Sequence, residues 1–174
     1  MLRTYLLGPL TRLGLAAAAI ACAIDQAAKL WLLFSFDLAN RGIVHLAPFL
    51  DFVATWNTGI SYGLFPQESD FGRFVLLALK AGAIVVLWVW LARAESKLTA
   101  LSLGLIIGGA IGNAIDRLAY GAVMDFVLFH ITTPTFNFVW YVFNLADAAI
   151  VAGVIGLLYE SLFGGAPQKR PDPA

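Results

Sequence analysis

Long apolar stretches separated by polar segments dominate the pattern along the chain. Four of them contain few charged residues and run from Leu13 to Phe36, Phe74 to Leu91, Leu98 to Ile115 and Phe138 to Phe163. A helix needs about 20 apolar residues to cross the roughly 30 Å hydrocarbon core of a bilayer. The pattern therefore predicts an all-α membrane protein, with a four-transmembrane-helix bundle in a single domain of residues 1–174.

The connections between the apolar stretches have a pattern typical of short β-strands. β-Branched and aromatic residues occur with turn formers at residues 43–46, 49–56 and 123–131. The second and third apolar stretches are joined by only a few residues, so both longer connections lie on the same side of the membrane. We therefore expect these strands to pair in a small sheet on that surface.

The distribution of lysine and arginine predicts which side the sheet faces, because the cytoplasmic flanks of membrane helices carry the excess of basic residues. The side of the termini has Arg3, Arg12, Arg93, Lys97, Lys169 and Arg170, and the side of the sheet has Arg41, Arg73 and Arg117. We therefore expect both termini in the cytoplasm and the sheet outside. Residues 164–174, rich in proline and glycine, are expected to form a disordered cytoplasmic tail.

Composition agrees with a membrane protein and excludes other classes. Hydrophobic residues make up 60% of the chain and charged residues 13%, with a mean hydropathy of +0.82. The net charge is zero, so no basic surface for nucleic acid is expected. Cys22, His45 and His130 form no recognisable ligand cluster, and we expect no metal site.

A competing interpretation of the N-terminus is a cleaved signal peptide, because Arg3 and Arg12 precede an apolar run that reaches Cys22. The run continues past Cys22 to Phe36, which is typical of a membrane span rather than of a cleavage junction. We therefore expect this region to form the first helix.

Ionisable residues inside membrane helices are costly, so each is a candidate for a function or a structural pair. Asp25 and Lys29 are four residues apart, so their opposite charges share one helix face and can neutralise each other. Lys80 is the only charged residue of the second span. Its long apolar stem can lie along the helix while the ammonium group reaches a more polar region, and we assign it no chemistry.

The third span combines small residues with a polar end. Its glycines at 104, 108 and 112 recur every fourth residue and predict a smooth face for close helix packing. Asn113 precedes Asp116 and Arg117 by three and four residues, which places it beside both. The adjacent acid and base indicate a structural clamp at the outer boundary.

Three further polar residues point to chemistry. Asn144 and Asp147 are three residues apart in the fourth predicted span, so they share a face, and Asp147 has no basic neighbour within one turn. Asp125 follows the Gly121 turn near the same boundary. Two carboxyl groups that meet share one proton, so one can activate water while the other polarises a carbonyl, as in aspartic proteases. Alternatively, Asp125 caps a turn and Asp147 belongs to a proton relay.

Five motifs together resemble the lipoprotein signal peptidase family, also called signal peptidase II. They occur in the family's order and cover most of the chain. The motifs are Asp25-Gln26 with Lys29, Asn57-Thr58-Gly59, Gly108 to Asn113 continuing to Asp116-Arg117, Gly121 to Phe126, and Phe143 to Asp147. Two positions depart from the family pattern: Tyr62 stands where another aromatic or small residue is common, and Val142 where proline is common. Neither is expected to touch the catalytic aspartates.

The resemblance implies an aspartyl endopeptidase of the bacterial inner membrane, with its active site on the periplasmic side. It would cut the signal peptide of a prolipoprotein just before the diacylglyceryl-modified cysteine, among membrane lipids and without cofactor or metal, and globomycin is an expected inhibitor. The implied fold is a four-helix bundle with a small extracytoplasmic sheet and a short surface helix. The implied catalytic pair is Asp125 and Asp147. The implied supporting residues are Asp25, Lys29, Asn57, Gly59, Asn113, Asp116, Arg117 and Asn144.

Two other functions are compatible with the apolar pattern. A small transporter or proton channel would use Asp25, Lys29 and Asp147 as a relay across the membrane. A structural membrane subunit would use none of them chemically. The polar positions are expected to converge near the outer side, which favours a reaction at the membrane surface over transport across the membrane.

Overall fold

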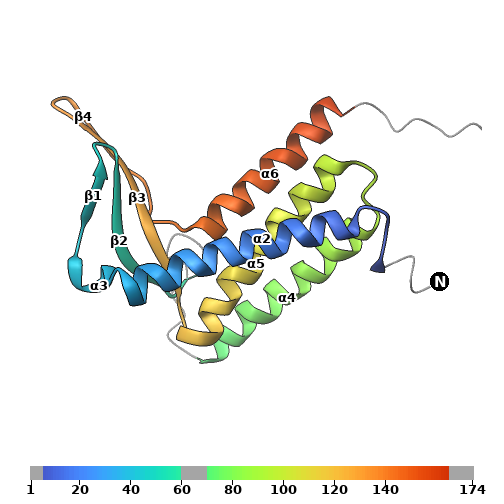
Figure 1. Cartoon of the computed structure of the whole chain (residues 1–174), viewed down its shortest axis with the longest axis horizontal. Helices are drawn as coiled ribbons and strands as arrows, with labels where there is room; N and C mark the ends of the chain where they lie inside the picture. The colour runs from blue at the N-terminus through green and yellow to red at the C-terminus, as the bar shows by residue number, and fades with distance from the viewer. Residues whose placement is uncertain (1–5, 60–69, 165–174) are drawn as a thin grey trace, which may run out of the picture.

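The computed structural model describes residues 6–59 and 70–164; Arg3, Tyr62, Lys169 and Arg170 lie outside these ranges. Its elements in chain order are α2 (Thr11–Leu30), η1 (Trp31–Ser35), α3 (Leu38–Arg41), β1 (Val44–Ala47), β2 (Leu50–Asn57), α4 (Asp70–Ala92), α5 (Lys97–Tyr120), β3 (Val123–Thr133), β4 (Phe136–Val139) and α6 (Leu145–Phe163). The long helices form a bundle, and the strands extend from one end of it (Figure 1).

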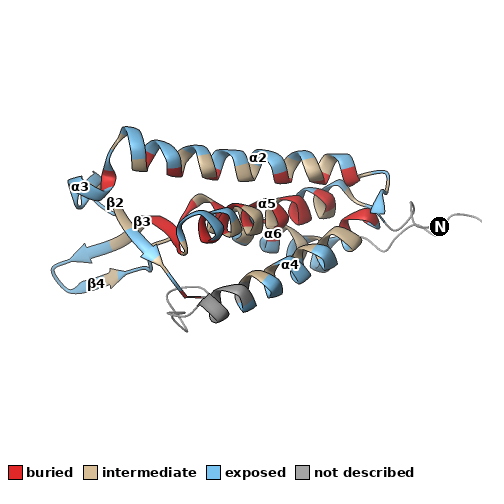
Figure 2. Ribbon diagram, turned by 90° about the horizontal axis from the view of Figure 1, so that it is seen from below, coloured by how far each residue is buried: buried red, intermediate tan, exposed pale blue. Residues whose placement is uncertain are grey.

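Helix α5 is the centre of the bundle, and it contacts α2, α4 and α6. Figure 2 shows that buried residues gather along α5, whereas the outer helices are largely exposed. The predicted glycine face explains how closely the helices approach. A Cβ at Gly108 would overlap the backbone of Ala18 on α2, and a Cβ at Gly109, which was not part of the predicted face, would overlap the backbone of Ala146 on α6. The glycines therefore let α5 contact two helices at backbone distance.

Three helices of the described part are long and apolar enough to cross a membrane: Thr11–Ser35, with 25 residues including η1, Lys97–Tyr120, with 24, and Leu145–Phe163, with 19. Helix α4 has 23 residues, and its described part includes the apolar stretch Leu77–Ala92. The count of four membrane spans therefore stays a prediction.

The predicted start of the last span is wrong. The sequence pattern began it at Phe138, but residues 136–139 form strand β4, and the helix begins only at Leu145. Aromatic residues such as Phe138 and Trp140 are apolar enough to extend a hydropathy window, although here they belong to the sheet and the segment after it. This difference moves Asn144 and Asp147 from inside a helix to its first turn.

The four strands form an antiparallel sheet in the order β1-β2-β3-β4. The expected pairing of the two connections is confirmed by β2 and β3, in which Thr55 lies opposite Asp125 and Asn57 opposite Val123. The end of the sheet next to the bundle packs on a small apolar core that includes Leu32, Leu38, Met124 and Phe126. Strand pairing therefore brings Asn57 close to Asp125, where the sheet meets the helices.

We predict that Gly108→Ala lowers the free energy of unfolding by about 1–3 kcal/mol, because the added methyl group would force α5 and α2 apart. Thermal unfolding in detergent measures the change. Gly82→Ala on α4 is the matched control, since a Cβ there would meet no atom within 4 Å. Equal losses in the two variants would contradict the packing argument.

Candidate active site

Asp147 owes its position to the start of α6. Asn144 has an extended backbone and caps the helix: the Asp147 N–H donates to Asn144 Oδ1 at 2.9 Å, and the Asn144 N–H donates to Asp147 Oδ2 at 3.2 Å. This reciprocal pair is a capping box. The Asp147 carboxyl group thus lies at the positive end of the helix dipole. The isolated carboxylate expected inside a span is therefore a half-buried N-terminal residue held by its own helix.

Asp125 lies on β3 and is buried, with two side-chain amides bound to its carboxyl group. Asn144 Nδ2 donates to Oδ1 at 2.6 Å, and Asn57 Nδ2 donates to Oδ2 at 3.1 Å. Burial raises the pKa of Asp125 to about 6, with a further contribution from the negative charge of Asp147, against the opposing effect of the two amide hydrogen bonds. The pKa shift therefore keeps a proton on this carboxyl group well above the usual range of aspartate.

Asn113 on α5 completes the connection between the two carboxyl groups. Its Nδ2 donates to Asp147 Oδ1 at 2.9 Å, and its Oδ1 accepts from Asn144 Nδ2 at 3.1 Å. A continuous chain of side-chain hydrogen bonds thus runs from Asp125 through Asn144 and Asn113 to Asp147. Each amide is oriented by a partner on both sides, which fixes the directions of the carboxyl groups.

A buried ion network lies beneath these residues. The predicted Asp25–Lys29 pair is confirmed, with 2.8 Å between Nζ and Oδ2, and Asp116 Oδ2 lies on the other side of Lys29 Nζ at 2.7 Å. All three side chains are buried. Lys29 Nζ also donates to Asn113 Oδ1 at 3.2 Å, so the network extends to the amide that holds Asp147.

The same network joins elements that are far apart in the sequence. Asp25 Oδ1 accepts from the Ala146 N–H at 2.9 Å, and Asp116 Oδ2 accepts from the Met124 N–H at 3.2 Å. Gln26 Nε2 donates to Asp116 Oδ1 at 2.9 Å. The carboxylates of α2 and α5 therefore secure the backbones next to Asp147 and Asp125.

The Asn57–Gly59 turn is held by one more charged residue. Arg117 Nη2 donates to the Gly59 carbonyl oxygen at 2.6 Å, and the Gly59 N–H donates to Asn57 Oδ1 at 3.0 Å. The charged residues at the end of α5 thus bind different segments: Asp116 binds Lys29, and Arg117 binds the turn. Together these contacts bring all ten predicted site residues to the sheet end of the bundle, rather than to several depths.

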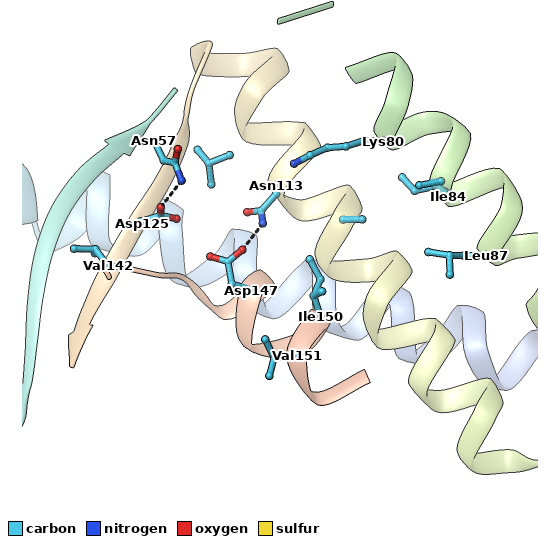
Figure 3. Close-up of a pocket in the computed structure, with 13 residues that line it drawn as sticks. Asn57, Lys80, Ile84, Leu87, Asn113, Asp125, Val142, Asp147, Ile150 and Val151 are labelled. Atoms are coloured by element: carbon cyan, nitrogen blue, oxygen red, sulfur yellow. Dashed lines mark hydrogen bonds between the residues drawn. The ribbon is translucent and has the colours of Figure 1, made fainter. Parts of the chain in front are cut away.

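Both carboxyl groups face one cavity of about 260 Å³ between α4, α5, α6 and the sheet (Figure 3). Asn57, Asn113, Asp125 and Asp147 form its polar side, and the apolar walls include Ile84 on α4 and Ile150 on α6. A water molecule and a polar backbone can be bound at the carboxyl groups while apolar groups lie along the helices.

Sequence reasoning missed two polar residues of this region. Gln26 follows Asp25 in one of the motifs, but nothing in its spacing indicated Asp116 as its partner. Lys80, to which no chemistry was assigned, lines the cavity and extends from α4 toward the polar side chains in Figure 3. Orientation around the second helix was the missing information, because the residues around Lys80 are apolar on every side.

The histidines lie elsewhere. His45 Nδ1 is 2.8 Å from one oxygen of Asp51 on the sheet, and His130 Nε2 is 3.0 Å from the other. Neither histidine lines the cavity. Across the ranges 6–59 and 70–164, no three histidine, cysteine, aspartate or glutamate residues are grouped so that they could hold a metal ion.

Comparisons with known proteins give a consistent result. The family model described as signal peptidase (SPase) II matches residues 17–163. The lipoprotein signal peptidase of Nitrobacter hamburgensis is 59% identical over 160 residues, 92% of this chain and 98% of that protein. The corresponding protein of Rhodopseudomonas palustris strain TIE-1 is 58% identical, over the same 92% and 98%. A bacterial membrane enzyme solved by the in meso method at 2.3 Å shares the fold, with a TM-score of 0.67 at 22% identity over 92% of this chain and 94% of that one.

We predict that Lys29→Met lowers the free energy of unfolding by about 3–5 kcal/mol, because it leaves Asp25 and Asp116 buried without their shared cation. Chemical or thermal unfolding in detergent checks this value. The control is Lys97→Met, which removes an exposed lysine at the start of α5. A Lys29 variant as stable as this control would show that the ion network contributes little.

Proposed function

The chain belongs to the signal peptidase II family, and from this premise we propose that it cleaves prolipoproteins immediately before the diacylglyceryl-modified cysteine, with Asp125 and Asp147 as an aspartyl pair. The observation that carries the proposal is that two carboxyl groups, one from β3 and one from α6, face the same cavity and share a chain of amide hydrogen bonds. The family resemblance read from the five motifs is confirmed, and the protein is a bacterial membrane peptidase by family.

The proposed reaction is direct hydrolysis by a water molecule held between the carboxyl groups. Ionised Asp147 takes a proton from the water, whose oxygen attacks the scissile carbonyl carbon, while Asp125 gives its proton to the carbonyl oxygen. The gem-diol then collapses: the C–N bond breaks, the leaving amine takes the proton from Asp147, and Asp125 recovers a hydroxyl proton. No acyl-enzyme forms, and the pair returns to its starting state.

The different surroundings of the two residues support these roles. Burial raises the pKa of Asp125 to about 6, which favours the acid. Asp147 lies in the first turn of α6, and its carboxyl oxygens accept from the Asn113 amide and the Asn144 N–H, so hydrogen-bond donors surround the proposed base. The two groups therefore hold one shared proton, mainly on Asp125.

The cavity walls support a substrate that is polar at the cleaved bond and apolar around it. Asp125 on β3 and Asp147 in the first turn of α6 lie where the helices meet the sheet, so the peptide bond reaches water while the acyl chains stay in the bilayer. We further propose that the site lies on the periplasmic side and that both termini lie in the cytoplasm. Arg12, Arg93 and Lys97 lie at the end of the bundle away from the sheet, and basic residues are in excess on the cytoplasmic side. Globomycin is expected to compete for this same cavity.

A proton relay is less well supported by the arrangement. A transporter or channel needs polar groups at several depths. Asp25, Lys29 and Asp147 instead belong to one network at the sheet end, connected through Asn113. Proton flux into proteoliposomes is therefore expected to equal that of protein-free vesicles, whereas peptidase activity is expected in the same preparation.

We predict that the purified enzyme cleaves a diacylglyceryl-modified prolipoprotein in detergent and leaves the unmodified precursor uncut. Asp125→Asn and Asp147→Asn should each reduce kcat/KM by about 10²–10⁴-fold, because an amide of the same shape can neither take nor give the required proton. A gel-shift assay of the released signal peptide gives these rates. Asp37→Asn, at an exposed position with φ 53° that asparagine tolerates, is the matched control. Full activity in either site variant would refute the aspartyl pair.

We also predict a bell-shaped pH dependence of kcat/KM with its alkaline limb near pH 6, where Asp125 loses the shared proton. The Asn57 amide stabilises the ionised form of Asp125, so Asn57→Ala should raise that pKa and move the limb upward by about one unit. Initial rates across the acid and neutral range measure both limbs. A flat profile, or a limb that moves to lower pH in the Asn57 variant, would contradict the assignment.

A further inference from the structure

Lys80 is the only lysine or arginine among the described residues that line the cavity. It is half-buried on α4, and its ammonium group points toward the polar side chains of α5 and α6 (Figure 3). Its neighbours along α4 in the cavity wall are apolar, namely Ala83, Ile84 and Leu87. The ammonium group therefore shares the cavity with the carboxyl groups, and burial desolvates both Lys80 and Asp125 there.

The other charged groups around the cavity already have short contacts elsewhere. Lys29 lies between Asp25 and Asp116 on α2 and α5, at 2.8 and 2.7 Å; the two carboxylates and one ammonium group sum to −1, and Arg117 at the end of α5 brings the four residues to zero. Arg117 donates to the Gly59 carbonyl oxygen. Lys80 is attracted by Asp147 and Asp116 and repelled by Arg117 and Lys29. Asp147 is thus the carboxylate inside the cavity to which the charge of Lys80 is coupled.

We propose that Lys80 is a positioning residue that acts through Asp147 and sets the pH range in which the Asp125–Asp147 pair holds one proton. This inference rests on the proposed function, because it assumes that the singly protonated pair is the reactive form. It does not require Lys80 to touch the substrate.

The net charge of the cavity determines which protonation state of the pair is favoured. With Lys80 charged, the pair and the ammonium group sum to zero when the pair holds one proton, to +1 when it holds two, and to −1 when it holds none. A poorly solvated cavity favours the neutral sum. Without Lys80 the neutral sum would require two protons, so both deprotonation steps would move to higher pH. The difference in pH between the two deprotonation steps would change much less.

The test is the pH profile of kcat/KM for Lys80→Met with the diacylglyceryl-modified substrate. We expect both limbs of the bell to move to higher pH by about one unit, the size expected for a unit charge at several ångströms in a partly solvated site. Lys80→Arg keeps the charge and should retain the wild-type limbs. Lys97→Met removes a charge about 24 Å along α5 from Asn113, and it should leave both limbs unchanged. Limbs that stay in place, or move to lower pH, in Lys80→Met would overturn the proposal.

Two further measurements distinguish a failure of this inference from a loss of folding or of the proposed activity. Limb positions do not depend on the amount of folded enzyme, and Lys80→Gln provides a second neutral variant that retains polarity. Infrared titration of the carboxyl groups without substrate, with Asp125→Asn as the reference, measures the same pKa shift directly. An inactive wild-type protein would refute the proposed function, while the titration would still decide the role of Lys80: an upward shift supports it, and no shift rejects it.

Discussion

The position of Lys29 between two buried carboxylates is the constraint on which the rest of the site depends. Removing three charges from water is costly, and the cost is offset only when geometry brings opposite charges together and satisfies the remaining lone pairs. Here the lone pairs of Asp25 and Asp116 accept from the backbone of Ala146 and Met124. The charge compensation thus requires α2, α5, β3 and α6 to meet at one point.

The positions of Asp125 and Asp147 depend on this ion network. Lys29 donates to Asn113, Asn113 donates to Asp147, and the two backbones held by the ion network belong to residues adjacent in sequence to the carboxyl groups that face the cavity. A shift of α2 would therefore disturb both carboxyl groups, although α2 contributes no residue to the cavity lining. The glycine face of α5 has the same consequence, because close backbone approach lets short polar side chains bridge the helices.

Local patterns predicted those features that depend on spacing alone. The Asp25–Lys29 pair and the glycine face follow from a spacing of four residues, and the strands at 43–46, 49–56 and 123–131 follow from β-branched and aromatic residues beside turn formers; each has its counterpart in the structure. The Asp116–Lys29 contact spans two helices, and no periodicity encodes it. The side of α4 on which Lys80 lies was equally hidden, since a helix that is apolar on all sides carries no orientation signal.

The error at the last span has a more specific cause. The aromatic residues from Phe138 to Tyr141 extended the apolar pattern toward the helix, and the single polar residue Asn144 did not interrupt it. However, asparagine followed three residues later by aspartate is a capping signal, and Asn144 does cap α6. This wrong boundary placed Asn144 inside the helix, whereas in the structure it is the residue that caps it. Asn144 caps α6 and so orients Asp147, and its side-chain amide donates to Asp125 at 2.6 Å and to Asn113 at 3.1 Å. Because one amide sets the orientation of both carboxyl groups, the start of α6 and the geometry of the pair are the same structural feature, and a helix begun seven residues earlier, at Phe138, would have separated them.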